Sequence, residues 1–231
     1  MSAQRLSLKR GLGEVLLITA SILLAFSLEA WWAERGDRAR FDEVVLAARA
    51  EFAGARAELA RAHAIHEATA TTLQELLTLM SPAPRESAMD SLNALWEGVR
   101  FTSADVPRGV LANLLASGEI STLPDAELRA RLSAWPAALE DHIATEGMYE
   151  AALDHLRGLV SARSPIPPGY GAPDYTSAFP ARTRAVLSDF AIENALSRSL
   201  HLLQIVIGEN EALSGAVGET LTDLDAYLAS R

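Results

Sequence analysis

The chain has 231 residues, enough for one anchor and one domain with a sizeable core. Its net charge is −10, and the first 40 residues hold six basic and only four acidic side chains, so the body after them is strongly acidic. Such a body argues against nucleic-acid binding, and the absence of cysteine excludes disulfides, thiolate catalysis and cysteine metal sites. Lys9 is the only lysine, which excludes a Schiff-base or phosphate-loop lysine from the body.

Residues 11–33 form the most apolar stretch of the chain. Their uncharged core, residues 15–28, would be about 21 Å long as a helix, short for a hydrocarbon core of about 30 Å. The flanks lengthen it, because carboxylates and tryptophans suit the headgroup region of a bilayer. The predicted membrane-interface residues are Glu14, Glu29, Trp31 and Trp32. We therefore predict a transmembrane anchor over 11–33, preceded by a short basic tail, residues 1–10.

The orientation of this anchor follows from the order of its charges. Three basic residues precede the stretch and three follow it closely, so the positive-inside rule does not decide. Basic residues followed by an apolar run are typical of an export signal, which favours a cytoplasmic N-terminus and an extracytoplasmic body. The expected location is the cytoplasmic membrane, crossed once. A cleaved signal and a soluble exported domain are the alternative, with small-residue cleavage sites near residues 25–30.

The body, residues 37–231, is predicted to be all-α, because its apolar residues recur at steps of three and four and no strand pattern occurs. Long helices are expected at about 37–80, 125–163 and 189–229, and a proline-rich loop at 164–180. The fold class is therefore an N-terminal transmembrane helix followed by an antiparallel bundle of three long helices plus two short ones.

The two short helices are expected between the first two long ones. The first covers about residues 86–101, and the second covers about 110–116. Asp105 and Pro107 resemble an N-cap followed by a proline in the first turn, so the second short helix is expected to start at Asp105. We expect both to cap the turn after the first long helix, at the end far from the anchor.

Two segments of the chain carry patterns shared with a known family. In the first, Gly13-Glu14 and an aliphatic run lead to Ile22-Leu23-Leu24-Ala25, and Trp32 stands before Glu34-Arg35. The second is Leu111 to Leu132, LANLLASGEISTLPDAELRARL. Together they resemble an uncharacterised family of bacterial single-pass membrane proteins, which often has a polar QINN where this chain has Ser27-Leu28-Glu29-Ala30. The resemblance implies an N-terminal anchor in the bacterial inner membrane and a helical C-terminal domain, and it implies no activity.

Each long helix carries a stripe of apolar residues along one face, here called its seam. Polar residues interrupt the seams of the three long helices at one predicted level. With antiparallel helices, Met80 would lie near Leu128 and Val160 near Phe41, which brings the interruptions together. They are His66, His142, Glu146, Asn210 and Ser214. A hydrogen-bonded polar layer of this kind fixes the register of a bundle. The alternative is a small-ligand or pH-sensing pocket in the bundle core.

Catalytic and metal-binding patterns are missing from the sequence. His63 and His66 lie one helical turn apart and could share an ion, but zinc needs further ligands that their neighbours do not supply. We therefore predict no catalytic residue, no cofactor and no metal.

The sequence as a whole predicts a membrane-anchored, non-enzymatic helical module that senses or scaffolds. Its expected partners are the lipid bilayer and either a second copy of the chain or another membrane protein. The alternative within the same fold is a small-ligand-binding protein or enzyme that uses the polar layer.

Overall fold

The computed structural model describes the backbone of residues 2–123, 125–165 and 182–229. It describes the side chains of the same residues apart from 2–18, 20, 34, 37–39, 89, 90, 93 and 94. Three long helices dominate: α1 (Ser2–Leu79), α4 (Ala126–Ser161) and α6 (Phe190–Ala229). The shorter elements are α2 (Glu86–Glu97), α3 (Gly109–Ser117), the 3-10 helix η1 (Glu119–Thr122) and α5 (Thr183–Leu187). The predicted all-α class is confirmed. The predicted loop 164–180 lies outside the described residues from residue 166 onward.

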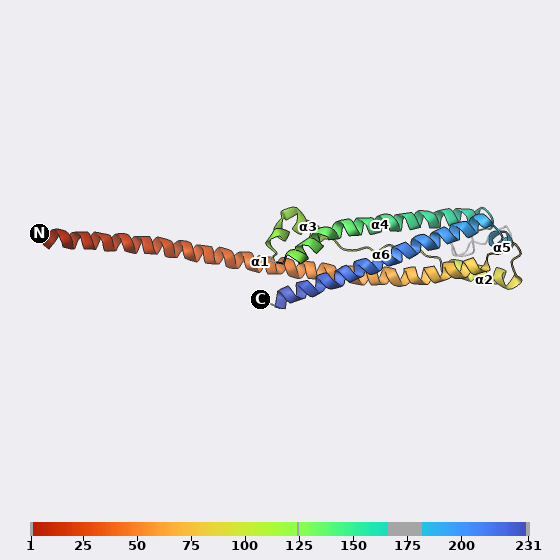
Figure 1. Ribbon diagram of the computed structural model, residues 1–231, viewed down its shortest axis with the longest axis horizontal. Helices are drawn as coiled ribbons and strands as arrows, with labels where there is room; N and C mark the ends of the chain where they lie inside the picture. Colours follow the sequence, from red (N-terminus) through yellow and green to blue (C-terminus); the bar gives the residue numbers. More distant parts are fainter. Residues whose placement is uncertain (1, 124, 166–181, 230–231) are drawn as a thin grey trace.

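The first long helix is longer than expected. α1 runs unbroken from Ser2 to Leu79, so the predicted tail, anchor and first bundle helix form one element, which projects beyond the bundle at its N-terminal end (Figure 1). The helix stops just before Pro82 and Pro84, as expected of residues that lack a backbone donor. α4 begins at the expected N-cap, Asp125, whose carboxylate accepts the N–H groups of Glu127 and Leu128 at 2.8 and 3.1 Å.

Among the residues that the structure describes, no helix has an apolar stretch long enough to cross a membrane. The transmembrane helix predicted over 11–33 is therefore not supported. The uncharged core of that segment, residues 15–28, is bounded by Glu14 and Glu29 and is shorter than a hydrocarbon core.

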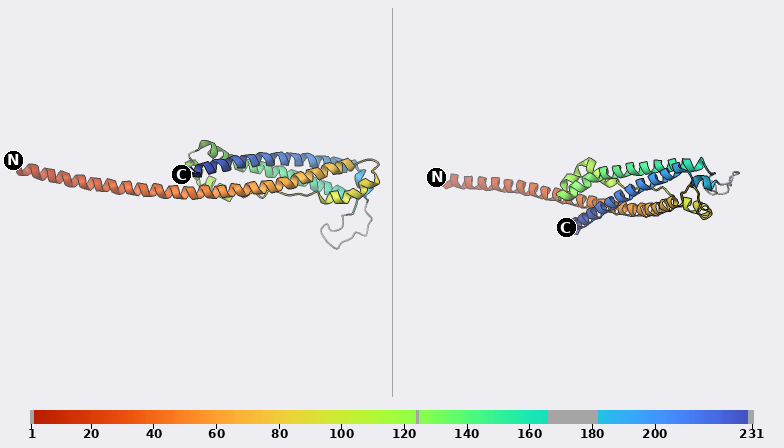
Figure 2. Two further views of the ribbon diagram at one scale, coloured as in Figure 1. Left: turned by 90° about the horizontal axis from the view of Figure 1, so that it is seen from below. Right: turned by 45° about the vertical axis from the view of Figure 1, so that its right-hand side comes forward.

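The predicted antiparallel arrangement of α4 and α6 agrees with the structure, but the predicted direction of α1 relative to these two helices is wrong (Figures 1 and 2). α1 and α4 run in the same direction, and α6 runs antiparallel to both (Figures 1 and 2). Phe52 of α1 packs on Trp135 near the start of α4, with ring centroids 5.3 Å apart, and Phe41 packs on Tyr227 at the end of α6 at 5.7 Å. Short loops impose antiparallel neighbours, but the long connection between α1 and α4 returns along the bundle before α4 begins.

Residues 98–108 of this connection, here called the strap, lie extended between α1 and α4 (Figure 1). Burial alternates over the second half of the strap as in a strand: the side chains of Ala104 and Val106 are buried, whereas those of Ser103 and Asp105 are exposed. Val99 is buried near the start of the strap. α2 therefore lies at the distal end of the bundle, and α3 lies back at the proximal end, where α1 enters (Figure 1). The expectation that both short helices cap the distal end holds for α2 alone.

The predicted start of the second short helix at Asp105 is also wrong. α3 begins at Gly109, because the strap stays extended until it has passed α1 at Gly54, where an added Cβ would lie 3.2 Å from Pro107. The helix is capped from another element: the carboxylate of Glu51 on α1 accepts the N–H groups of Val110 and Leu111 at 2.6 and 2.9 Å.

The apolar core has two parts, one on each side of the middle of the bundle. The proximal part includes Phe52 and Leu59 of α1 with Leu132 and Trp135 of α4. The distal part is built around residues further along the same helices; they include Leu73, Leu76, Leu153, Leu156, Leu196 and Leu203. The polar residues lie between these two parts.

Candidate functional site

The predicted polar layer lies in the middle of the bundle. His66, His142, Glu146 and Asn210 are all buried, and Ser214 is half-buried. The register that predicted their meeting was wrong, since His66 lies level with Tyr149, whose ring it meets edge-on at 6.3 Å. The layer exists nonetheless because His142 and Glu146 lie near the midpoint of α4 and Asn210 lies at the midpoint of α6. Reversing a helix about its midpoint moves its ends and leaves its middle in place.

His66 of α1 contacts the strap. Its Nε2 lies 3.0 Å from the carbonyl oxygen of Thr102, and because a carbonyl only accepts, Nε2 carries the hydrogen. The other ring nitrogen, Nδ1, is then an acceptor, and it is buried without a hydrogen-bond partner. Burial lowers the pKa of His66, and the bond to Thr102 and the charge of Glu146 oppose this only in part. His66 is therefore neutral near neutral pH.

His142 of α4 lies between two carboxylates. Its Nε2 is 3.3 Å from Oε1 of Glu146, one turn along the same helix, and its Nδ1 is 3.4 Å from Oε2 of Glu209 on α6. The contact with Glu146 is an ion pair by distance, although the Nε2–H direction does not give a linear hydrogen bond. Burial lowers the pKa of His142, but the two carboxylates outweigh burial and raise it above its usual value. As the pH falls, His142 therefore takes up its proton before His66 does.

Glu146 connects His142 to the strap. Its side chain is 4% exposed, and Oε1 accepts the backbone N–H of Ala104 at 3.1 Å. Glu209 binds a second group of α4, because its Oε1 accepts the hydroxyl of Thr145 at 3.0 Å. Contacts between titratable side chains and the strap therefore join α1, the strap, α4 and α6 at one level.

Further side chains hold the carbonyl groups of the strap. The carbonyl oxygen of Arg100 lies 3.4 Å from the hydroxyls of Tyr149 and Thr69, and Arg61 donates to the carbonyl oxygen of Ser103 at 3.0 Å. Burial raises the pKa of Tyr149 far above its usual range, so its hydroxyl keeps its proton. In the centre of the strap, helix side chains take the place of a neighbouring strand.

Sequence reasoning did not find Thr69, Tyr149, Glu209 or the strap. Thr69 and Tyr149 belong to the seams of their helices, and a polar or aromatic seam residue resembles ordinary core. The strap did carry a partial signal, an alternation of apolar and polar residues that is interrupted once, at Thr102-Ser103; such alternation is typical of a half-buried extended segment.

Asn210 and Ser214 are not joined to the histidines. The Ser214 hydroxyl lies 3.5 Å from Oδ1 of Asn210, one turn away on α6, while Nδ2 of Asn210 is buried without a hydrogen-bond partner. Among the described residues no hydrogen bond connects this pair to His66 or His142. α6 reaches the histidines through Glu209 instead, the residue before Asn210.

A metal site is not formed by the predicted histidine pair. Nε2 of His63 lies 3.5 Å from Oε1 of Glu67 on the same helix. Within the described part of the chain, no three histidine, aspartate or glutamate side chains are grouped to hold an ion.

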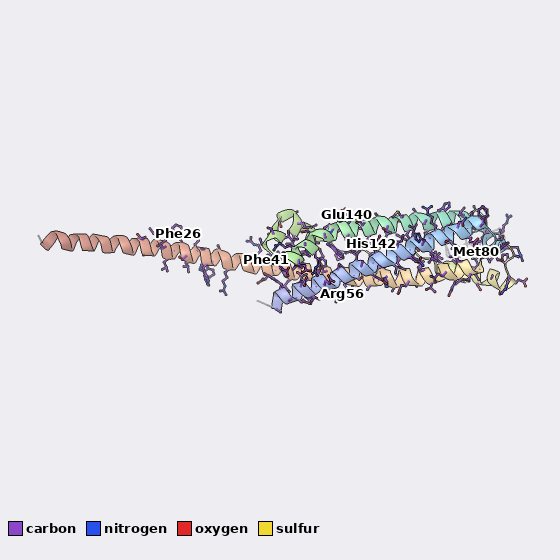
Figure 3. All side chains as sticks on the ribbon, viewed as in Figure 1. Phe26, Phe41, Arg56, Met80, Glu140 and His142 are labelled. Carbon is purple, nitrogen blue, oxygen red and sulfur yellow. The ribbon has the colours of Figure 1, made fainter. Side chains whose placement is uncertain are left out.

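A cleft of about 490 Å³ lies at the distal end of the bundle, away from the polar layer. It is formed where α1 ends and α2 begins, and its lining includes Thr78, Met80, Arg85 and Ser87. Figure 3 shows Met80 at this end and His142 in the middle of the bundle, so the cleft does not open onto the histidines.

The predicted membrane-interface residues lie on the part of α1 outside the bundle. Glu29, Trp31 and Trp32 are exposed, the two indole rings meet edge-on at 5.3 Å, and the guanidinium of Arg35 lies 5.3 Å from the centre of the Trp31 ring. Glu14 lies outside the residues whose side chains are described.

No family model, curated protein or solved structure matches this chain. The resemblance to bacterial single-pass membrane proteins therefore stays a prediction, and the function is argued from the geometry alone.

Proposed function

We propose that this protein is a non-enzymatic helical module that attaches to a lipid bilayer through residues 21–33 of α1 and acts through protein partners. The observation that carries the proposal is the exposure of large apolar side chains on every side of this segment. The bundle beyond it is the part that meets partners.

The exposed side chains occupy nearly consecutive positions. Leu23 is 61% exposed, Leu24 73% and Phe26 64%, and Ile22 and Leu28 are exposed to a similar extent. Successive residues of a helix are rotated by about 100°, so these side chains point in all directions around α1. A single partner helix would cover one stripe of them, whereas the acyl region of a bilayer covers them all.

The residues that follow suit the boundary of a bilayer. Trp31 and Trp32 are amphipathic aromatics, which are enriched at the headgroup level, and Arg35 lies over the Trp31 ring. Figure 3 shows Phe26 on the projecting part of α1, well away from the bundle, whereas Phe41 lies where the bundle begins. The apolar segment is thus free to enter lipid without disturbing the core.

A module that works through partners is supported by the continuity of α1. The helix that carries the apolar segment also supplies Val45, Phe52 and Leu59 to the core, with no break between the two parts. Displacement or rotation of either part therefore reaches the other without a hinge.

Flotation with vesicles of phosphatidylcholine and phosphatidylglycerol tests the proposal. The full chain should float with the vesicles, and the double variant Leu24→Glu/Phe26→Glu should stay in the dense fractions, at least tenfold depleted from the lipid. Leu46→Glu is the matched control, because Leu46 is exposed to a similar extent but lies on the bundle part of α1. A wild-type chain that remains in the dense fractions, or a double variant that still floats, would overturn bilayer attachment.

A further inference from the structure

We propose that the polar layer is an acid-sensitive latch, in which protonation of His66 releases the strap from the groove between α1 and α4. This inference rests on the proposed function, since it supplies a stimulus and a moving part for a module that acts through partners. It is carried by the position of the strap, by the charges around His66 and by an unpartnered ring nitrogen.

The strap lies between α1 and α4, two helices that both pack on α6. α1 and α4 both approach α6 more closely than each other, although Phe52 and Trp135 pack between them in the proximal core, and the strap lies between them at the level of His66. Removing the strap would therefore leave both α1–α6 and α4–α6 packing in place. It would also uncover the faces of α1 and α4 that now contact the strap, a surface for a partner.

The polar layer supplies part of the hold on the centre of the strap, beside the contacts of Thr69, Tyr149 and Arg61 with its carbonyl groups. The strap contributes three small buried apolar side chains, Val99, Ala104 and Val106, and one half-buried aromatic, Phe101, whose ring lies 6.0 Å from that of Tyr149. At its centre, Thr102 is bound by His66 and Ala104 by Glu146. The long helices, by contrast, are held by the large apolar side chains of the two core parts. Loss of the layer should thus free the strap before the helices separate.

The charges that face His66 make a second proton unfavourable. From α4 it faces Glu146 and the charged His142, and from its own helix His63. The strap presents only the Thr102 carbonyl to it, and α6 presents Glu209, which lies on His142. Glu146 is shared between His142 and the strap. A proton on His66 would therefore place a second buried positive charge beside one carboxylate that is already paired.

The same proton would create an unsatisfied donor. Nδ1 of His66 is buried without a partner, which a neutral ring tolerates because Nδ1 then carries only a lone pair. On protonation Nδ1 gains an N–H that has no acceptor, and a buried charged donor requires one. Water is the available acceptor, and it enters where the cover is thinnest, at the strap, whose Ser103 and Asp105 side chains already face solvent.

The direction of the response follows. Burial disfavours the charged form of His66, so the strap is held at neutral pH and is released at a pH below the ordinary pKa of histidine. Glu146 and Glu209 raise the pKa of His142 while burial lowers that of His66, so His142 already carries its proton when His66 titrates, and His66 supplies the change.

Hydrogen–deuterium exchange on the full chain tests the latch. Between pH of about 7.5 and about 5, and after correction for intrinsic exchange, strap amides should exchange at least tenfold faster at the lower pH, while amides of α4 and α6 keep their protection. His66→Gln should remove this response, because the glutamine amide can donate to Thr102 and takes up no proton. His201→Gln, at an exposed histidine of α6, is the matched control and should respond as the wild type does.

Three results would overturn the latch: a strap equally protected at both pH values, a His66→Gln variant that still responds, or simultaneous exchange of strap and helices. If His66→Gln does not fold, NMR titration of the wild type decides, because the ring signals of His66 and the amide signal of Ala104 must change with one midpoint. Flotation measures bilayer attachment independently of the strap. A protein that floats with vesicles but whose strap does not respond to pH would therefore contradict the latch and still support bilayer attachment.

Discussion

Oε1 of Glu146 lies 3.3 Å from Nε2 of His142 and 3.1 Å from the backbone nitrogen of Ala104, so a single buried oxygen serves both a charged side chain and the strap. A change in the charge of Glu146 or His142 should therefore alter the hydrogen bond that holds the strap at Ala104. The following predictions probe this relationship and the contacts that support it.

The free energy of unfolding should peak near pH 6.5, the ordinary pKa of histidine. His66 has a lowered pKa in the folded state, so its contribution is complete above that value and is lost as the pH falls through the folded-state pKa. His142 has a raised pKa, so its contribution is complete below that value and is lost as the pH rises. Urea unfolding at closely spaced pH values should show both limbs. His142→Gln should flatten the alkaline limb alone, and a variant that flattens both would contradict the assignment.

Replacing Glu146 by Gln should lower the pKa of His142 and destabilise the fold by about 2–4 kcal/mol, because a buried charged histidine loses one of its two carboxylates. NMR titration of the His142 ring and urea unfolding measure the two effects. Glu150→Gln, at an exposed position of α4, should change neither. An unchanged His142 pKa in Glu146→Gln would mean that Glu209 alone keeps His142 charged.

Replacing Glu51 by Gln should weaken the start of α3. The carboxylate accepts two backbone N–H groups, and an amide offers one oxygen without charge, so a loss of about 1 kcal/mol is expected. Exchange of the Val110 and Leu111 amides should accelerate more than that of α4. Glu43→Gln, at an exposed position of α1, is the control. Equal protection in both variants would show that the N–H groups find another acceptor.

Glycine-to-alanine replacements at two positions should have opposite signs. At Gly98, where the strap begins, an added Cβ would lie 2.9 Å from Oγ1 of Thr72, so Gly98→Ala should cost about 1–3 kcal/mol. At Gly147, inside α4, nothing lies within 4 Å, and Gly147→Ala should stabilise by up to about 1 kcal/mol through helix propensity. Thermal unfolding of both variants measures the difference, and a neutral Gly98→Ala would show that Thr72 moves aside.

The pattern of apolar residues predicted the helices because packing and periodicity are local properties of the sequence. The ends of α4 and α6 fall within two residues of the expected positions, and the prolines after Leu79 mark the end of α1. Helix direction is not local. It depends on the path of the connection between Leu79 and Ala126, because the apolar pattern of a seam is compatible with either direction of the helix.

The candidate site was predicted in part, for a related reason. Buried polar residues in the middle of three seams are visible in a sequence, and His66, His142 and Glu146 do lie in one buried layer. Their actual partners lie on a segment with no regular secondary structure, held by backbone contacts at Thr102 and Ala104. Contacts made by backbone groups leave no residue-type signature, so the strap could not be assigned to the layer from the sequence.

The unbroken α1 helix also fixes the distance between the tryptophans and the level of the strap. At 1.5 Å per residue, the 34 residues from Trp32 to His66 measure about 50 Å along the axis. With the tryptophans at the surface of a bilayer and the helix upright, the strap stands about that far above the lipid. A partner that reads the strap must then either approach from the aqueous phase or carry its own domain to the same elevation, which excludes small proteins embedded flat in the membrane.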